Sequence, residues 1–397
     1  MVKKTALVNN PQKPSQKIVQ SHAVKIFGNR LTKNKPDARI FTELLRMTDM
    51  DNQPESKMTI DKVAKLCGVS KTTISRFLNG KYENMSAETR EHIRRVIAEV
   101  DYHPNRSAQR LKASRSMLIG CVIGDISSPF SALLLKGITT VCEEAGYQVL
   151  FADSGENPRR ERRAIRGFLE NRVDGLIINT SGNNDAFLLE LQSGGTPLVL
   201  ADRQLLSSDK IDTVTTPSKS AAYDCVRFLL AQGYTKVAFF SETIGHISPR
   251  ILRRQGYEEA IRDLAGPGAE PETYEFSAED IDSCKSCLRV FRRKYPNERI
   301  AVFSANGASA QRLLVAMKEL DIEPGYDFGF CTFDDWNWLQ IAKPGISAVS
   351  LATVDVGAKA AELLLERISG RRPAGARAVT VEIPSHFVVR ESTPAQK

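Results

Sequence analysis

Hydrophobic positions between Thr59 and Pro104 recur at the spacing of α-helices. The buried faces of three successive stretches would be Ile60, Val63 and Ala64, then Ile74, Phe77 and Leu78, and then Ile93, Val96, Ile97 and Val100. A hydroxyl residue able to cap a helix precedes each stretch: Thr59, Ser70 and Ser86. Gly68 suits the left-handed turn after the first helix. The pattern predicts three short helices.

The second of these helices would carry Lys71, Thr72, Ser75 and Arg76 on its outer face. Two short helices joined by a glycine-containing turn are typical of a helix-turn-helix unit, whose second helix fits the DNA major groove. From this helix Arg76 can make a bidentate contact to guanine, with Lys71 and Thr72 near base edges. The pattern alone leaves open a three-helix fragment with a solvated basic face.

From Met117 onward, apolar runs rich in β-forming residues alternate with helical stretches. The runs are MLIGCVIGD, YQVLFAD, VDGLIINT, PLVLAD, KVAFFSE, RIAVFSAN and DFGFCTFDD. Near-continuous apolar strands indicate burial on both faces, and repeated strand–helix alternation predicts parallel sheets. There are too many runs for one compact half. We therefore expect two α/β lobes, with a ligand cleft at the carboxyl ends of the strands.

Polar residues recur where these apolar runs end: Asp125, Asn179, Asp202, Arg203, Asn306, Asp334 and Asp335. Each one alone is explained as well by a helix cap or a turn. Together they predict a cleft that binds the hydroxyl groups of a polyol. Arg250, Arg253 and Arg254 follow the KVAFFSE run, and with Arg203 they raise the hypothesis of an acidic sugar such as a gluconate derivative.

The positive charge is confined to the first part of the chain. The formal net charge is +8, and the first 116 residues hold 23 basic against 11 acidic side chains, whereas the remainder holds 32 against 36. A basic end on a mildly acidic body is typical of nucleic-acid binding. A surface charged only for solubility would not be so asymmetric.

Other classes of protein lack support in the sequence. The seven scattered cysteines favour reduced, buried thiols, and the lone pair Cys284 and Cys287 lacks partners for a metal site. No apolar signal core or membrane-length run is present, which predicts a cytoplasmic protein without a membrane segment. Ser207 and Ser208 lack a nearby His, and Asp334 and Asp335 would point to opposite faces of a strand. We expect no enzyme activity, cofactor or metal.

The chain resembles the LacI/GalR family of bacterial transcription regulators over roughly residues 58–393. The resemblance rests on TIDKVAKLCGVSKTTISRFLNG, SAETREHI and YHPNRSAQRLK in the head, and on GLIIN, RRQGY, FDDW and VVREST in the body. It implies an all-α helix-turn-helix headpiece, a hinge helix, and an α/β two-lobed core like the periplasmic sugar-binding proteins. The lobes would be joined by three crossovers, near Pro217, Leu351 and His386.

The resemblance also implies roles in DNA binding. Lys71, Thr72 and Arg76 match base-reading positions. The positions that match phosphate contacts are Ser70, Asn79, Ser86 and Thr89. Asn105 would begin the hinge helix, Leu111 matches the leucine that enters the minor groove, and Lys112 follows it as in the purine-repressor branch. A hinge this short is expected to fold only on DNA.

In the cleft, Pro129 and Phe130 match the family's apolar wall, Arg253 its ligand-clamping arginine and Asp334 its hydroxyl-binding carboxylate. Asn179, Asp202 and Asn306 match further polar positions. The chain departs from the family where Gly307 replaces the usual aspartate and where Leu351-Ala352 replaces Gln-Pro. Trp336 and Trp338 would either cover an apolar sugar face or pack the lobe interface.

Four domains follow from this resemblance: a basic extension predicted to be disordered (1–57), a headpiece (58–104), a hinge and linker (105–116) and a ligand-binding core (117–397). The N-lobe would comprise about 117–216 and 352–385, and the C-lobe about 217–350 and 386–397. The extension would be either an added basic DNA-binding arm or the product of a misassigned translation start.

The function implied is that of a cytoplasmic, nucleoid-associated homodimer that binds a palindromic operator in double-stranded DNA. It would repress a carbohydrate-utilisation operon and respond to a small sugar or sugar acid. A corepressor-dependent regulator of the purine-repressor type and a stand-alone sugar-binding protein are the alternatives. The second would need a signal peptide and has no use for a headpiece. The sequence leaves open whether the effector weakens or strengthens DNA binding.

Overall fold

The computed structural model describes residues 58–78, 80–83, 85–102, 115–373 and 375–396. The chain divides into two compact units, residues 1–111 and 112–397. The extension 1–57 and the predicted DNA contacts Asn79, Asn105, Leu111 and Lys112 lie outside the described residues. Within the part that is described, no helix is long and apolar enough to cross a membrane, and no group of His, Cys, Asp or Glu side chains could hold a metal ion.

The first unit contains the three predicted helices, α3 (Ile60–Leu66), α4 (Lys71–Leu78) and α5 (Ala87–Glu99). Their caps are those expected from sequence, because the hydroxyl of Thr59 accepts from the amide of Lys62 at 3.4 Å and that of Ser70 accepts from Thr73 at 3.1 Å. Val63, Ile74 and Ile93 have no exposed surface and form the centre of the small core. Burial of one face of each helix therefore holds this unit together.

The second unit contains two six-stranded sheets. The N-lobe sheet has the order β11-β5-β4-β3-β1-β2 and the C-lobe sheet the order β12-β10-β9-β8-β6-β7. The N-lobe strands are β1 (Leu118–Ile123), β2 (Gln148–Asp153), β3 (Gly175–Ile178), β4 (Leu198–Ala201), β5 (Asp212–Thr215) and β11 (Thr380–Glu382). The C-lobe strands are β6 (Lys236–Glu242), β7 (Thr273–Phe276), β8 (Ile300–Ser304), β9 (Gly329–Phe333), β10 (Ser347–Leu351) and β12 (Ser385–Val388).

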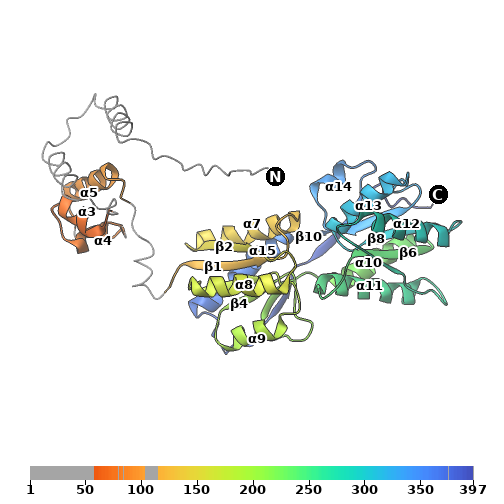
Figure 1. Cartoon of the computed structure of the whole chain (residues 1–397), viewed down its shortest axis with the longest axis horizontal. Coiled ribbons are helices and arrows are strands. Elements are labelled where there is room, and N and C mark those ends of the chain that lie inside the picture. Colours follow the sequence, from red (N-terminus) through yellow and green to blue (C-terminus); the bar gives the residue numbers. More distant parts are fainter. Residues whose placement is uncertain (1–57, 79, 84, 103–114, 374, 397) are drawn as a thin grey trace, which may run out of the picture. The chain divides into compact units, whose positions relative to one another are not determined.

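Helices cover both faces of each sheet (Figure 1). Those of the N-lobe are α7 (Pro129–Glu144), α8 (Pro158–Glu170), α9 (Asp185–Ser193) and α15 (Thr353–Ser369). Those of the C-lobe are α10 (Ser218–Ala231), α11 (Ser248–Leu264), α12 (Ile281–Lys294), α13 (Gly307–Glu319) and α14 (Asn337–Ile341). Four apolar clusters fill the spaces between sheets and helices, two in each lobe. These findings confirm the predicted fold class of a helix-turn-helix unit with a two-lobed α/β core.

The chain passes between the two sheets three times. It leaves the N-lobe after β5, returns from β10 into α15, and crosses again between β11 and β12 at residues 383–384. Figure 1 shows the consequence, because the blue helix α15 lies among yellow and orange elements of the N-lobe. Each lobe is therefore built from segments that are distant in sequence, and the three crossings connect the lobes.

Glycines allow close helix contacts in both lobes. A Cβ atom on Gly137 of α7 would lie 2.0 Å from the carbonyl oxygen of Val354 in α15, and one on Gly256 of α11 would lie 2.0 Å from that of Lys219 in α10. Such contacts are far shorter than van der Waals separation. These two helix pairs pack backbone against backbone, which only glycine permits.

Two features of the sheets differ from the sequence prediction. The apolar run of β2 is only partly covered, and Phe151 is 54% exposed, because β2 is an edge strand that α7 and α8 overlap only in part. Strand β12 pairs with β10 in antiparallel orientation, whereas every other pairing is parallel among the described strands. The chain enters β12 from β11 of the other sheet and adds β12 to the edge of the C-lobe sheet beside β10.

Candidate functional site

A cleft of about 880 Å³ opens between the two lobes at the carboxyl ends of the strands. Its lining includes all seven residues predicted to bind the effector: Pro129, Phe130, Asn179, Asp202, Arg253, Asn306 and Asp334. They come from positions 129 to 334 and from both lobes. The fold therefore gathers in one cleft the side chains that the sequence analysis grouped by their positions after strands.

Asp202 and Asp334 occupy corresponding places in the two lobes. Each follows an inner strand, β4 or β9, and each has a positive φ, 66° and 68°. The left-handed conformation is unfavourable for residues other than glycine, and it concentrates at functional sites. Asp334 Oδ2 accepts from the amide of Gly307 at 2.9 Å, whereas Asp202 Oδ1 has no hydrogen-bond partner among the described residues. The Asp202 oxygen is thus available to a ligand hydroxyl.

Burial is the main influence on the pKa of the Asp202 carboxyl. It raises this pKa to about 6, and the guanidinium groups of Arg253 and Arg203 oppose the rise. A buried carboxylate with an unused oxygen costs free energy until a donor reaches it. A hydroxyl group of a bound polyol is such a donor.

Arg253 of α11 lines the cleft and is 4% exposed. Its Nη1 donates to the carbonyl of Ala305 at 2.8 Å, and its guanidinium carbon lies 4.0 Å from the centre of the Phe333 ring. Its Nε has no partner among the residues that the structure describes. The stacking on Phe333 fixes the plane of the guanidinium group, so the N–H bond of Nε points in a fixed direction.

There is a structural reason for glycine at position 307, where the family usually has aspartate. A Cβ atom there would lie 2.8 Å from the indole ring of Trp336, which lines the cleft. Asn306 caps α13 by accepting from the amide of Ser309 at 2.8 Å. Trp336 lines the cleft, whereas Trp338 packs against the core of the C-lobe.

The arginines that suggested an acidic ligand differ in position. Arg203 and Arg250 line the cleft, but both contact the carboxylate of Glu156, at 2.7 and 3.4 Å. Arg254 contacts Glu258 at 3.6 Å and is not part of the lining. Asp335 is likewise outside the lining, because it forms a two-bond ion pair with Arg390. Of the arginines noted from sequence, Arg203, Arg250 and Arg253 therefore line the cleft, and the first two are already paired with Glu156.

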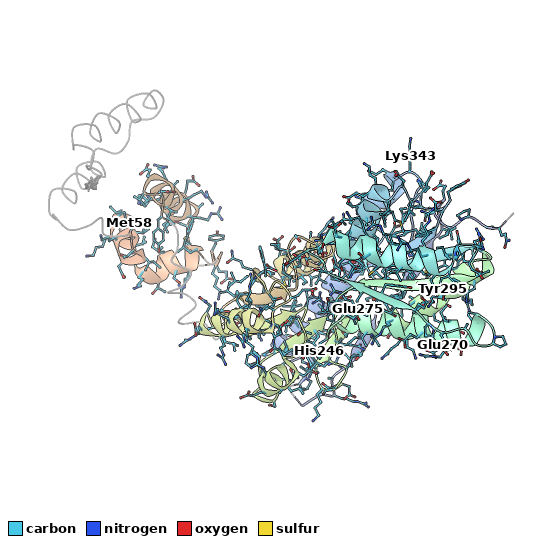
Figure 2. All side chains as sticks on the ribbon, turned by 45° about the vertical axis from the view of Figure 1, so that its right-hand side comes forward. Met58, His246, Glu270, Glu275, Tyr295 and Lys343 are labelled. Atoms are coloured by element: carbon cyan, nitrogen blue, oxygen red, sulfur yellow. The ribbon has the colours of Figure 1, made fainter. Side chains whose placement is uncertain are left out.

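The lobes touch each other beside the cleft. The amide of Gln204 in the N-lobe donates to the hydroxyl of Ser248 in the C-lobe at 2.9 Å. Gly182 packs on His246, which is labelled in Figure 2, and a Cβ at Gly182 would lie 2.7 Å from that of His246. Together with the contact between Glu156 and Arg250, these residues link the two sides of the cleft.

The outer face of α4 presents the residues predicted to read DNA bases. Lys71, Thr72 and Arg76 are all exposed on this helix. Lys71 Nζ contacts Asp61 Oδ2 of α3 at 2.8 Å, and this surface ion pair holds its ammonium group at the start of α4. Ser70 and Ser86 accept amide hydrogen bonds at the amino ends of α4 and α5, where backbone donors also favour phosphate. Thr89 contacts the hydroxyl of Ser86 at 2.8 Å.

Comparison with known proteins identifies this combination of units. Residues 59–105 match the model for bacterial regulatory proteins of the lacI family, and residues 116–390 match that for periplasmic binding proteins and the sugar binding domain of the LacI family. The HTH-type transcriptional regulator KdgR of Bacillus subtilis is 33% identical, over 86% of this chain and the whole relative. The chain belongs to the LacI family.

Two solved structures resemble most of this chain. The CelR–cellobiose complex is 25% identical, with a TM-score of 0.60, over 85% of this chain and all of that one. The lac repressor dimer bound to operator shares the fold with a TM-score of 0.73 at 24% identity, over 86% of this chain and all of that one. The relatives are transcriptional regulators and not enzymes, as the sequence predicts for this chain.

Five charged residues of this LacI-family cleft were not identified from sequence. They are Glu156, Glu242, Glu279, Arg312 and Glu319. The rule that found the other residues would have found two of them, because Glu242 ends the strand β6 and Glu156 lies in the loop after β2. Arg312 lies within α13 and carries no such signal.

Proposed function

We propose that this chain is a dimeric repressor of a carbohydrate-utilisation operon, and that a small sugar or sugar acid bound between the lobes controls its affinity for a palindromic operator. The observation that carries the proposal is the convergence of Asp202, Asp334 and Arg253 in the interlobe cleft. Paired carboxylates and a fixed guanidinium group are suited to a polyol, because each hydroxyl both donates and accepts. The cellobiose bound to the relative CelR supports a sugar-like ligand.

Control of DNA binding would follow from differential affinity. An effector that contacts both lobes favours the interlobe angle at which all of its contacts form. It shifts the population toward that angle only by the difference between its affinities for the two lobe arrangements. The contact between Gln204 and Ser248 belongs to one such arrangement. The first lobe continues directly into residues 105–116, the predicted hinge, so a change in the angle between lobes alters the spacing of two hinges in a dimer.

For DNA recognition we assign base reading to Lys71, Thr72 and Arg76, and phosphate contacts to Ser70, Asn79, Ser86, Thr89 and Asn105. Leu111 and Lys112 would act in the minor groove. Two headpieces would read half-sites in successive major grooves, with the protein in the bacterial cytoplasm beside its operator. The operator-bound lac repressor dimer supports this arrangement through its fold.

The test begins with selection of bound sequences from random DNA by the full-length protein, which is expected to yield a palindrome. Fluorescence anisotropy then measures operator affinity with and without each sugar or sugar acid that shifts the melting temperature. An effector that weakens operator binding supports induction, whereas one that strengthens it supports the purine-repressor type of control. Sugar binding without sequence-specific DNA binding would favour a sugar-binding protein and overturn the proposal.

A further inference from the structure

Five charged side chains of the cleft form a continuous row across the two lobes. In order they are Arg203, Glu156, Arg250, Glu242 and Arg312, with successive N–O distances of 2.7, 3.4, 3.2 and 3.5 Å. All five line the cleft. The row contains three guanidinium groups and two carboxylates, so it carries one positive charge in excess.

Glu156 is more exposed than the two arginines that it contacts. It lies in the loop between β2 and α8, where Gly155 and Glu156 both have positive φ values, 56° and 53°. Its side chain is 32% exposed, against 12% for Arg203 and 10% for Arg250. One oxygen, Oε1, accepts from both guanidinium groups. A short rotation toward solvent would release both donors without disturbing the backbone.

The two arginines, by contrast, are fixed by the protein. Arg203 Nη1 donates to the carbonyl of Thr180 at 3.1 Å, and Arg250 Nη1 donates to that of Thr243 at 2.9 Å. Gly124 leaves room for Arg203, since a Cβ there would lie 3.0 Å from its guanidinium nitrogens. Burial raises the pKa of Glu156, but Arg203 and Arg250 together lower it further, so the net value lies below the ordinary one. At neutral pH the pair of arginines therefore holds a charged carboxylate.

We propose that Glu156 occupies the place of the effector's carboxylate, and that the effector is a polyhydroxylated carboxylic acid which displaces Glu156 from Arg203 and Arg250. The proposal rests on the proposed function and names the class of its effector. The hydroxyl groups would contact Asp202, Asp334 and Arg253. Loss of the contact between Glu156 and Arg250 would also remove an ion pair between the lobes, which couples ligand binding to lobe movement.

Among the other acids of the lining, Glu242 shares Arg250 with Glu156, at 3.2 Å, whereas Asp125, Glu279 and Glu319 do not contact Arg203 or Arg250 in the part of the chain that is described. Asp125 accepts from the amide and hydroxyl of Ser127, at 2.8 Å each, and Glu319 contacts Lys285 at 2.8 Å. Glu279 is exposed at the cleft edge. Glu156 is thus the carboxylate that contacts both Arg203 and Arg250, and its displacement opens Arg203 Nη2 to the cleft while Arg250 stays paired with Glu242.

Isothermal calorimetry on the full chain tests the proposal with matched ligands. The panel contains six-carbon aldonates, 2-ketoaldonates and uronates, each beside a neutral counterpart in which CH₂OH replaces the carboxylate. We expect an acid to bind at least about 10-fold more tightly than its neutral counterpart, as for a hydrogen bond to a charged group. Glu156→Gln is expected to tighten binding of that acid several-fold and to leave neutral ligands unchanged, because the competing charge is gone.

Two further variants separate this role from a structural one. Arg250→Gln is expected to weaken binding of the acid about 10-fold or more. Arg254→Gln is the matched control, since Arg254 is on the same helix outside the lining, and it is expected to change nothing. The inference would be overturned if neutral sugars bind more tightly than every acid, or if Glu156→Gln weakens binding of the acid. Either result would still be compatible with the proposal that the effector is a sugar. Failure of every ligand to bind would overturn the sugar effector itself.

Discussion

Arg367 and Asp212 lie 155 positions apart and form a two-bond ion pair inside the N-lobe, with Nε–Oδ2 and Nη2–Oδ1 distances of 2.7 and 3.1 Å. Asp212 begins β5, before the chain enters the C-lobe, and Arg367 is on α15, after it returns. Asp212 also accepts from the amide of Val379 at 2.8 Å. The pair therefore ties the second N-lobe segment to the first.

Asp212→Ala is expected to lower the free energy of unfolding by about 3–5 kcal/mol, because it leaves the buried Arg367 without its counter-charge. Urea denaturation followed by circular dichroism measures the loss. In the double variant Asp212→Ala/Arg367→Met the loss should be smaller than the sum of the single losses. Additive losses would show that the two side chains act independently.

Asp202→Asn is expected to stabilise the core at neutral pH and to weaken effector binding. Burial raises the pKa of Asp202 to about 6, so the folded state holds this proton more tightly than the unfolded chain. The resulting stabilisation is complete below about pH 4 and is lost as the pH rises through 6. A pKa difference of about two corresponds to about 3 kcal/mol, so the variant should gain on the order of 1–3 kcal/mol at pH 7.

Urea midpoints of both proteins at pH 4, 5, 6 and 7 check this dependence. The difference between Asp202→Asn and the natural chain isolates the group, because other titrating side chains contribute to both proteins. A difference that is constant with pH would contradict the assignment.

Gly137→Ala is expected to destabilise the N-lobe by about 1–3 kcal/mol or more, since its Cβ would lie 2.0 Å from the carbonyl oxygen of Val354. Gly167→Ala in α8 is the control, because a Cβ there meets nothing within 4 Å. The control should gain about 0.5–1 kcal/mol from its better helix propensity. Melting temperatures of the two variants should therefore move in opposite directions.

Arg76→Ala is expected to cost about 1–3 kcal/mol of operator affinity and to relax the preference at one base pair. Anisotropy titrations against operators changed one position at a time measure this. Lys65→Ala, which removes an exposed positive charge from α3, is the control for the loss of charge alone. Equal weakening on every sequence would identify Arg76 as a phosphate contact instead.

Leu111→Ala tests the hinge assignment, which rests on the family resemblance. Operator affinity should fall because a minor-groove wedge is lost, while calorimetric affinity for the effector should stay the same. An unchanged operator affinity would remove the assignment of Leu111.

The sequence by itself determined the local elements and the kind of residue at each strand end. Helical periodicity and hydroxyl caps specified α3, α4 and α5, because a helix buries residues close together in sequence. Asp202, Asn306 and Asp334 were found by one rule, that parallel strands end at the same edge of a sheet. The strands β5, β7, β10, β11 and β12 were not among the predicted runs. The sequence of β5, Asp-Thr-Val-Thr, looks polar and exposed although the strand is buried.

Only the tertiary structure decided the partners of these residues. Asp212 is buried because Arg367 neutralises it from across the chain, and Glu156 holds Arg203 and Arg250 from two different lobes. The run of β2 resembles an inner strand in sequence, yet its place at the sheet edge leaves Phe151 exposed. Ion pairing and exposure depend on which distant segments the three crossings bring together, and no local pattern encodes that.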